Sequence, residues 1–205
     1  MFYCAKLFYK VGCIGGDGMV RKRNLTKEKI IQSAFSLADE IGLNQVTFQK
    51  IAVKLDIKYP SLYNHFTNMD DLKIKMTQYL LNQLNLKLMQ KLIGKSGENA
   101  IKEFAYGYRD FAFENKTAYG LFMNIPSIED EEVYRLLKDF SSILHQVLGF
   151  YIKDKTLLIH KGRALRSLLH GHVSLCFLGY FQNPVSLEDS FQFMLDDFIL
   201  SISRI

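Results

Sequence analysis

Hydrophobic residues recur at steps of three and four positions along nearly the whole chain, which is the period of an amphipathic helix. The first series lies between Thr26, a candidate N-cap, and Gly42, a candidate terminator. No stretch shows a convincing two-residue alternation, so we predict an all-α fold. Further helices are expected at about 48–55, 58–65, 69–93, 98–115, 117–123, 129–150, 154–182 and 186–203.

Glycine-rich stretches suggest how the chain is divided. The sequence Gly15-Gly16-Asp17-Gly18 precedes Met19, and we expect residues 1–18 to be a disordered extension. Lys6 and Lys10 interrupt the apolar start, so no signal peptide is expected. Residues 19–68 are predicted to form a front domain of short helices. Residues 69–205 would form a helical back domain that begins with the long helix 69–93.

One segment of the back domain, 163–181, is apolar on nearly every face. Such a helix must be covered on all sides, either by its own domain or by a second subunit. Gly171 lies in its interior, where glycine costs about 1 kcal/mol against alanine, and this suggests the close approach of another helix.

Composition supports a folded protein and adds a charge asymmetry. Hydrophobic residues make up 48% of the chain and charged residues 23%, as in ordinary globular proteins, and no apolar run is long enough to span a bilayer. Residues 20–95 carry 13 Lys and Arg against 6 Asp and Glu, whereas residues 96–205 carry 11 against 14. A basic front suggests a polyanionic partner, although an ordinary solvated face would look the same.

The informative motif lies between Phe48 and Phe66, where two short helices are separated by a sharp turn. Ala52 supplies the small residue at which such helices cross, and Asp56 stands where the backbone must become left-handed. This is the pattern of a helix-turn-helix, although a plain helical hairpin is the alternative. The corner would bury Ile51, Leu55, Ile57 and Leu62. The second helix would expose Lys58, Tyr59, Ser61, Tyr63, Asn64 and His65, which are suited to the major groove of DNA.

Residues 25–72 resemble the DNA-binding domain of the tetracycline-repressor (TetR) family of bacterial regulators. The resemblance rests on Ile30-Ile31 with Ala34, Gly42, Thr47, Ile51-Ala52, Tyr59-Pro60-Ser61-Leu62-Tyr63-Asn64-His65-Phe66 and Asp71-Leu72. It implies that Tyr59, Pro60, Ser61 and Asn64 contact base edges. It also implies that Tyr63, His65, Thr47 and Lys50 contact phosphates. With Lys58, these residues form the predicted DNA-binding set.

Two positions depart from the family pattern. Asp56 stands where the family usually has glycine, and Met69 stands where it usually has a lysine near a phosphate. The lost lysine should lower affinity and flatten the salt dependence of binding. The basic arm Arg21-Lys22-Arg23 could compensate by reaching the flanking minor groove.

The segment Leu168-Leu169-His170-Gly171-His172-Val173-Ser174-Leu175 is similar to a TetR-family C-terminal domain named for a Trp-His-Gly tripeptide, with Leu169 in place of the tryptophan. The resemblance implies that the last two long helices pair with their copies in a four-helix dimer interface. It also implies that the remaining helices enclose a ligand pocket. Most aromatic residues at helical spacing belong to a core, but a domain this aromatic can line an apolar cavity. The candidates for its walls are Phe104, Tyr108, Phe111, Phe122, Met123, His145, His170 and Phe177.

Other chemistry finds little support. His170 and His172 would point to faces about 200° apart on a helix, so they cannot chelate one ion. The three cysteines, Cys4, Cys13 and Cys176, show no metal or disulfide spacing, which fits a reducing cytoplasm. Gly94-Lys95-Ser96 lacks the context of a phosphate loop, and no hydrolase or metalloprotease motif is present. No enzyme activity, cofactor or metal is expected.

Taken together, these features predict a cytoplasmic, homodimeric transcriptional regulator. It would bind a palindromic operator in double-stranded DNA as a repressor and leave it when a small-molecule effector, whose identity the sequence does not reveal, occupies the back domain. No membrane partner is expected. The alternative is a helical ligand-binding or interaction protein whose helix-turn-helix no longer reads DNA.

Overall fold

The computed structural model describes residues 25–123 and 125–203, and within these ranges it contains helices and no strands. The predicted extension 1–18 and the arm Arg21-Lys22-Arg23 lie outside the described residues. The α-helices are α1 (Lys27–Ile41), α2 (Phe48–Leu55), α3 (Met69–Leu92), α4 (Gly97–Glu114), α5 (Gly120–Met123), α6 (Glu131–Leu148), α7 (Lys155–Phe177) and α8 (Leu187–Ser203). Three 3₁₀ segments join them: η1 (Leu43–Gln45), η2 (Tyr59–Asn64) and η3 (Ile125–Ser127).

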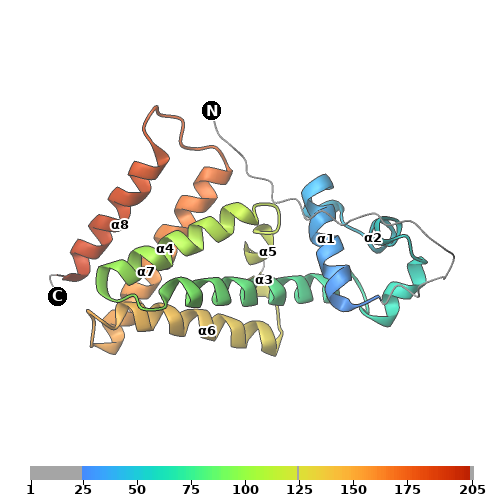
Figure 1. Ribbon diagram of the computed structural model, residues 1–205, viewed down its shortest axis with the longest axis horizontal. Helices are drawn as coiled ribbons and strands as arrows, with labels where there is room; N and C mark the ends of the chain where they lie inside the picture. Colours follow the sequence, from blue (N-terminus) through green and yellow to red (C-terminus); the bar gives the residue numbers. More distant parts are fainter. Residues whose placement is uncertain (1–24, 124, 204–205) are drawn as a thin grey trace.

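Helices α1 and α2 and the segment η2 form a small unit at one end of the molecule (Figure 1). Thr26 and Thr47 begin α1 and α2 as predicted. Each threonine hydroxyl accepts a hydrogen bond from the backbone N–H three residues later, at 3.3 Å. The core of the unit consists of fully buried apolar side chains, namely Ile30, Ala34, Ile51, Leu62 and Phe66.

The element predicted as a third short α-helix at 58–65 is a 3₁₀ segment, η2. Its bonds join residues three apart, as in Ser61 N–H to Lys58 O and His65 N–H to Leu62 O, both at 2.9 Å. Pro60 lies in the first turn and has no backbone N–H to donate. A segment of six residues that lacks this donor forms the tighter helix, which proteins use in short pieces.

The long helix α3 connects this unit to the rest of the molecule. Its start is fixed by Asn68, whose side chain accepts from the N–H of Asp71 at 2.9 Å, and by Asp71, whose carboxylate accepts from the N–H of Thr67 at 2.8 Å. With 24 residues, α3 is about 36 Å long. It therefore runs from the helix-turn-helix unit through the middle of the back domain (Figure 1).

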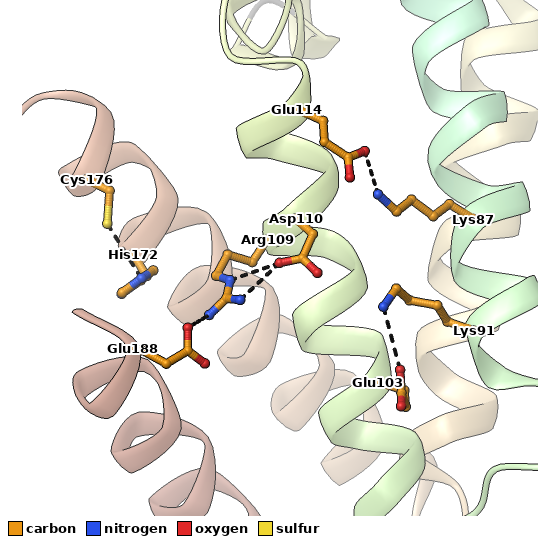
Figure 2. Close-up of polar contacts among 9 residues, drawn as sticks. All are labelled: Lys87, Lys91, Glu103, Arg109, Asp110, Glu114, His172, Cys176 and Glu188. Atoms are coloured by element: carbon orange, nitrogen blue, oxygen red, sulfur yellow. Dashed lines mark hydrogen bonds and ion pairs between the residues drawn. The ribbon is translucent and has the colours of Figure 1, made fainter. Parts of the chain in front are cut away.

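The back domain is a helical bundle in which α3 packs against α4 and α6, and α7 packs against α4 and α6. Ion pairs hold α4 on two sides (Figure 2). Toward α3, Lys87 pairs with Glu114 at 2.6 Å. Toward α8, Arg109 pairs with Glu188 at 2.7 Å. Helix α4 thus links the long helix to the C-terminal helix.

Helix α7 ends at Phe177, five residues before the predicted end at 182. The backbone turns left-handed at Gly179, with φ of 71°. The N–H of Gly179 bonds to the carbonyl of Cys176 at 3.1 Å, and that of Tyr180 to the carbonyl of Leu175 at 3.0 Å. This pair of bonds is the Schellman motif, which terminates a helix. Periodicity predicts helix up to residue 182 because apolar residues continue after Phe177, and periodicity alone does not detect a Schellman turn.

The close helix approach expected at Gly171 is not found among the described residues, because, apart from its chain neighbours and its own helix backbone, no atom lies within 4 Å of a Cβ placed there. Gly162, nine residues or about two and a half turns earlier on α7, packs closely instead, with the His145 ring 3.4 Å from its Cβ position. The outer surfaces of α7 and α8 are unusually apolar, with Leu175, Leu178, Phe193 and Leu200 exposed. No helix in the described part of the chain is long and apolar enough to cross a membrane.

Candidate functional site

The residues predicted to contact DNA lie on α2 and η2 or directly before them. Lys50, Lys58, Pro60, Tyr63 and Asn64 are exposed. The other four, Thr47, Tyr59, Ser61 and His65, are partly exposed. Beneath them, Ile51 and Leu62 are fully buried, while Leu55 and Ile57 are partly buried against the same core. The segment thus has one buried side and one side that presents hydrogen-bonding groups.

The turn between α2 and η2 has the geometry that the sequence predicts. Asp56 is left-handed, with φ of 53°, and it is the one non-glycine residue of the described chain with positive φ. Its N–H bonds to Val53 O at 3.1 Å, and the N–H of Ile57 bonds to Ala52 O at 3.0 Å. Aspartate tolerates this conformation better than most residues, so the family's usual glycine is not required.

Aromatic contacts hold η2 against α2. The Tyr63 ring meets the Phe48 and Tyr59 rings edge to face, each with centroids 5.3 Å apart. The Tyr59 and Tyr63 hydroxyls also hydrogen-bond to each other. This bond raises the pKa of Tyr59, so the hydroxyl stays protonated and can donate. The Tyr59 and Tyr63 side chains are therefore held in place before any partner arrives.

Two further residues shape this surface. Met69 is partly buried and packs against the core, and Asp70 and Asp71 follow it in the first turn of α3. The position where the family pattern has a lysine is therefore apolar, and two carboxylates lie next to it. Val53 projects from α2 with 82% of its surface exposed. The sequence analysis did not select it, although the apolar spacing already leaves it off the buried face.

A cavity of about 450 Å³ lies in the back domain between α3, α4, α6 and α7. Its size is within the range of small-molecule sites. Three of the predicted pocket residues, Tyr108, Phe122 and His170, line it. The full lining consists of Leu81, Leu84, Tyr108, Phe122, Ile125, Tyr134, Leu137, Phe140, Arg166, Ser167 and His170.

The other predicted pocket residues lie elsewhere. Phe104 is fully buried and packs on Phe140, and Phe111 is buried against Phe122, so both belong to the core behind the cavity. His145 lies against Gly162. Phe177 packs edge to face on Phe113 and Tyr119. The side chain of Met123 is outside the described part of the structure.

A hydrogen-bonded cluster forms the polar end of the cavity. The Tyr119 hydroxyl lies 2.9 Å from that of Tyr108 and 2.5 Å from Nδ1 of His170. Burial lowers the pKa of His170, which favours the neutral ring, and it raises the pKa values of Tyr108 and Tyr119. All three groups are therefore neutral near pH 7.

Sequence analysis missed Tyr119, which completes this cluster, and Tyr134, Arg166 and Ser167 in the lining. One signal was available, because Arg163 and Arg166 are the charges that interrupt the apolar segment 163–181. An arginine in an otherwise apolar helix faces either the protein surface or a polar cavity. The sequence alone does not show which of the two applies to Arg166.

Two family models match the chain. Residues 30–74 match the model of bacterial regulatory proteins of the tetR family. Residues 101–198 match a tetracyclin repressor-like C-terminal domain. The first match contains all of α2 and η2, and the second contains most of the cavity lining.

Relatives and solved structures agree with these matches. The HTH-type transcriptional regulator YobS of Bacillus subtilis is 27% identical over 177 residues, which cover 85% of this chain and 91% of YobS. A protein from Rhodococcus sp. RHA1 has a similar fold, with a TM-score of 0.79 and 12% identity over 90% of this chain and all of that one. A TetR variant from Acinetobacter baumannii AYE in complex with minocycline gives a TM-score of 0.67 and 19% identity, covering 88% and 98% of the two chains.

The helix-turn-helix unit, the helical back domain and both model matches lead to one assignment. The chain belongs to the TetR family of transcriptional regulators.

Proposed function

We propose that this protein is a ligand-released repressor that binds a palindromic operator as a homodimer. Residues 19–68 form its DNA-binding domain, and residues 69–205 form its ligand-binding and dimerisation domain. The observation that carries the proposal is the α2–η2 surface, where nine polar, aromatic or proline residues lie over the buried apolar residues Ile51 and Leu62.

The exposed residues suit both kinds of DNA contact. Lys50 and Lys58 can pair with phosphates, which supplies affinity without sequence information. Asn64 and Ser61 can hydrogen-bond to base edges, which supplies specificity. The edge-to-face contacts of Tyr63 hold these groups in one arrangement, so little ordering is needed on binding.

Dimerisation is supported by the outer surfaces of α7 and α8. Leu178 and Phe193 each keep 69% of their surface exposed in the single chain. A second copy would cover these side chains and the open space beside Gly171. Two recognition segments in successive major grooves would then have centres roughly 34–36 Å apart in the DNA-bound form.

Ligand release follows from linkage between the cavity and α3. Leu81 and Leu84 of α3 line the cavity, while the same helix also packs against α1 of the helix-turn-helix unit, where the Phe35 and Tyr79 ring centroids lie 5.7 Å apart. A ligand that prefers a second position of α3 by a few kcal/mol would weaken operator binding tens- to hundreds-fold. The Acinetobacter TetR variant of similar fold was solved in complex with minocycline, which supports a small-molecule effector for this protein.

Selection of duplexes from a random pool, followed by fluorescence anisotropy, tests the DNA-binding part. We expect a selected palindrome to bind at least about 10³-fold more tightly than random duplex at physiological salt. Asn64→Ala should reduce this preference by about 1–3 kcal/mol. Lys50→Ala should weaken binding to both duplexes and flatten the salt dependence.

Lys138→Ala is the matched control, because Lys138 is exposed on α6 in the back domain. Lys138→Ala should leave the affinity for both duplexes, and the preference for the selected duplex, unchanged. Equal binding of selected and random duplexes would refute the proposal. That result would favour the alternative, a helical ligand-binding protein whose helix-turn-helix no longer reads DNA, for which Met69 is the supporting observation.

A further inference from the structure

We propose that the effector is an apolar carboxylic acid, bound as its anion with the carboxylate on Arg166 and the hydrocarbon body between the aromatic walls of the cavity. The inference rests on the proposed function, because it names the ligand class of the same site.

Arg166 is a cation at the cavity without a carboxylate to neutralise it. Its guanidinium lies over the Phe140 ring, 5.2 Å from the centroid, and donates to Ser141 Oγ at 2.9 Å. Within the described ranges no Asp or Glu pairs with it, and none lines the cavity. Guanidinium has five N–H donors in a planar fork that matches a carboxylate, and one hydrogen bond leaves most of them free.

Comparison with the other arginines of the described chain shows what is particular to this one. Arg109 pairs with Asp110 and Glu188, and Arg135 pairs with Glu132 and Asp139. Arg163 is exposed and has no ion pair among the described residues either, but it does not line the cavity. Burial at the cavity lowers the pKa of Arg166, but a guanidinium remains charged at neutral pH. Arg166 is exposed on one side in the single chain, while the Phe140 ring covers its guanidinium, and this unneutralised cation gains from an anion that arrives beside the same apolar wall.

The polar neighbours of Arg166 also present donors. Nδ1 of His170 faces the Tyr119 hydroxyl at 2.5 Å, and Tyr119 in turn meets Tyr108. When the Tyr108 hydroxyl donates to Tyr119 and the Tyr119 hydroxyl donates to Nδ1, the neutral His170 ring carries its proton on Nε2. It can then donate a hydrogen bond from Nε2. Ser167 and Tyr134 add hydroxyl groups to the same lining. This set suits an acceptor-rich head group and offers no carboxylate to an ammonium.

The remaining walls require an apolar body. Leu81, Leu84, Phe122, Ile125, Leu137 and Phe140 provide the aliphatic and aromatic surface. A volume of about 450 Å³ accommodates a medium alkyl chain or a fused aromatic ring, together with its head group. A highly polar or multiply charged anion would leave these walls unfilled.

Isothermal titration calorimetry on the full-length protein without DNA tests the ligand class. The probes are decanoate and 2-naphthylacetate, each compared with its primary amide and with the amine of the same hydrocarbon body. We expect at least one acid to bind tenfold or more tightly than its amide, and the amine to bind more weakly still.

Variants then assign the preference to Arg166. Arg166→Gln should reduce binding of the acid to the level of the amide and leave binding of the amide unchanged. Arg166→Lys, which keeps the charge, should retain part of the preference. Arg163→Gln is the matched control, because Arg163 is an exposed arginine on the same helix that does not line the cavity. Circular dichroism melting verifies that each variant is folded.

The inference is overturned if neither acid binds, if acid and amide bind alike, or if Arg166→Gln keeps the preference for the acid. Adding the acid to the protein–DNA complex separates this result from the proposed function. An acid that binds through Arg166 but does not release DNA would refute ligand release and leave the ligand class in place.

Discussion

At the residue scale, single side chains show where sequence reasoning succeeds and where it stops. The buried positions Ile51 and Leu62 and the left-handed Asp56 follow from local spacing and from backbone chemistry, which the sequence states directly. The role of Arg166 does not follow from local spacing, because its surroundings depend on how α6 and α7 pack. Local rules therefore define the helix-turn-helix well and the cavity poorly.

Substitutions at Asp56 should reveal the cost of its left-handed backbone. Asp56→Val should lower the free energy of unfolding by about 1–2 kcal/mol, since β-branched residues strongly disfavour positive φ. Asp56→Gly should be as stable as the natural protein or slightly more so. Urea denaturation at one fixed protein concentration measures both. Asp56→Asn, which tolerates the conformation, is the control, and equal stability of all four proteins would contradict the argument.

At the element scale, helical periodicity predicted every long helix of the described chain within a few residues, because each one buries an apolar stripe. The errors come from features that periodicity does not encode. Pro60 shortens the recognition segment to a 3₁₀ helix, and the Schellman turn at Gly179 ends α7 early. The contacts that hold one helix to another were also beyond the sequence, since their partners lie far apart along the chain.

Arg109 provides a test of such a contact between α4 and α8. Its guanidinium stacks on Tyr106 and Phe191, 4.7 and 4.6 Å from the ring centroids, while it pairs with Glu188. Lysine keeps the charge but lacks the planar fork, so Arg109→Lys should cost about 1–2 kcal/mol of unfolding free energy. Chemical denaturation measures the loss. Arg135→Lys is the matched control, because Arg135 lies in an exposed ion-pair cluster. Its loss of unfolding free energy should stay below about 0.5 kcal/mol. Equal losses in the two variants would contradict a stacking role for Arg109.

At the scale of the whole molecule, the architecture consists of a helix-turn-helix unit and a bundle joined by α3, as the family resemblance implied. The apolar side chains that the single chain exposes to solvent indicate how the molecule interacts with others. The outer faces of α7 and α8 carry exposed apolar side chains, and a large exposed apolar patch usually marks an interaction site.

Replacing Phe193 with glutamate should therefore convert a dimer into monomers. Phe193 lies in the middle of α8 with 69% of its surface exposed, and a buried carboxylate at a dimer interface would lack a partner. Sedimentation velocity over a range of protein concentrations measures the change. Leu86→Glu, at an exposed leucine of α3, should leave the assembly intact. A natural protein that sediments as a monomer would refute the homodimer.

Helix α7 carries two surfaces at once, since Arg166, Ser167 and His170 line the cavity while Leu175 and Leu178 face outward. An effector that shifts α7 on binding would therefore change subunit association, and by thermodynamic reciprocity association would change effector affinity by the same factor. A dilute sample, in which subunits separate, would accordingly show a different effector affinity from a concentrated one. In a cell, the abundance of the regulator would tune its own sensitivity to the signal.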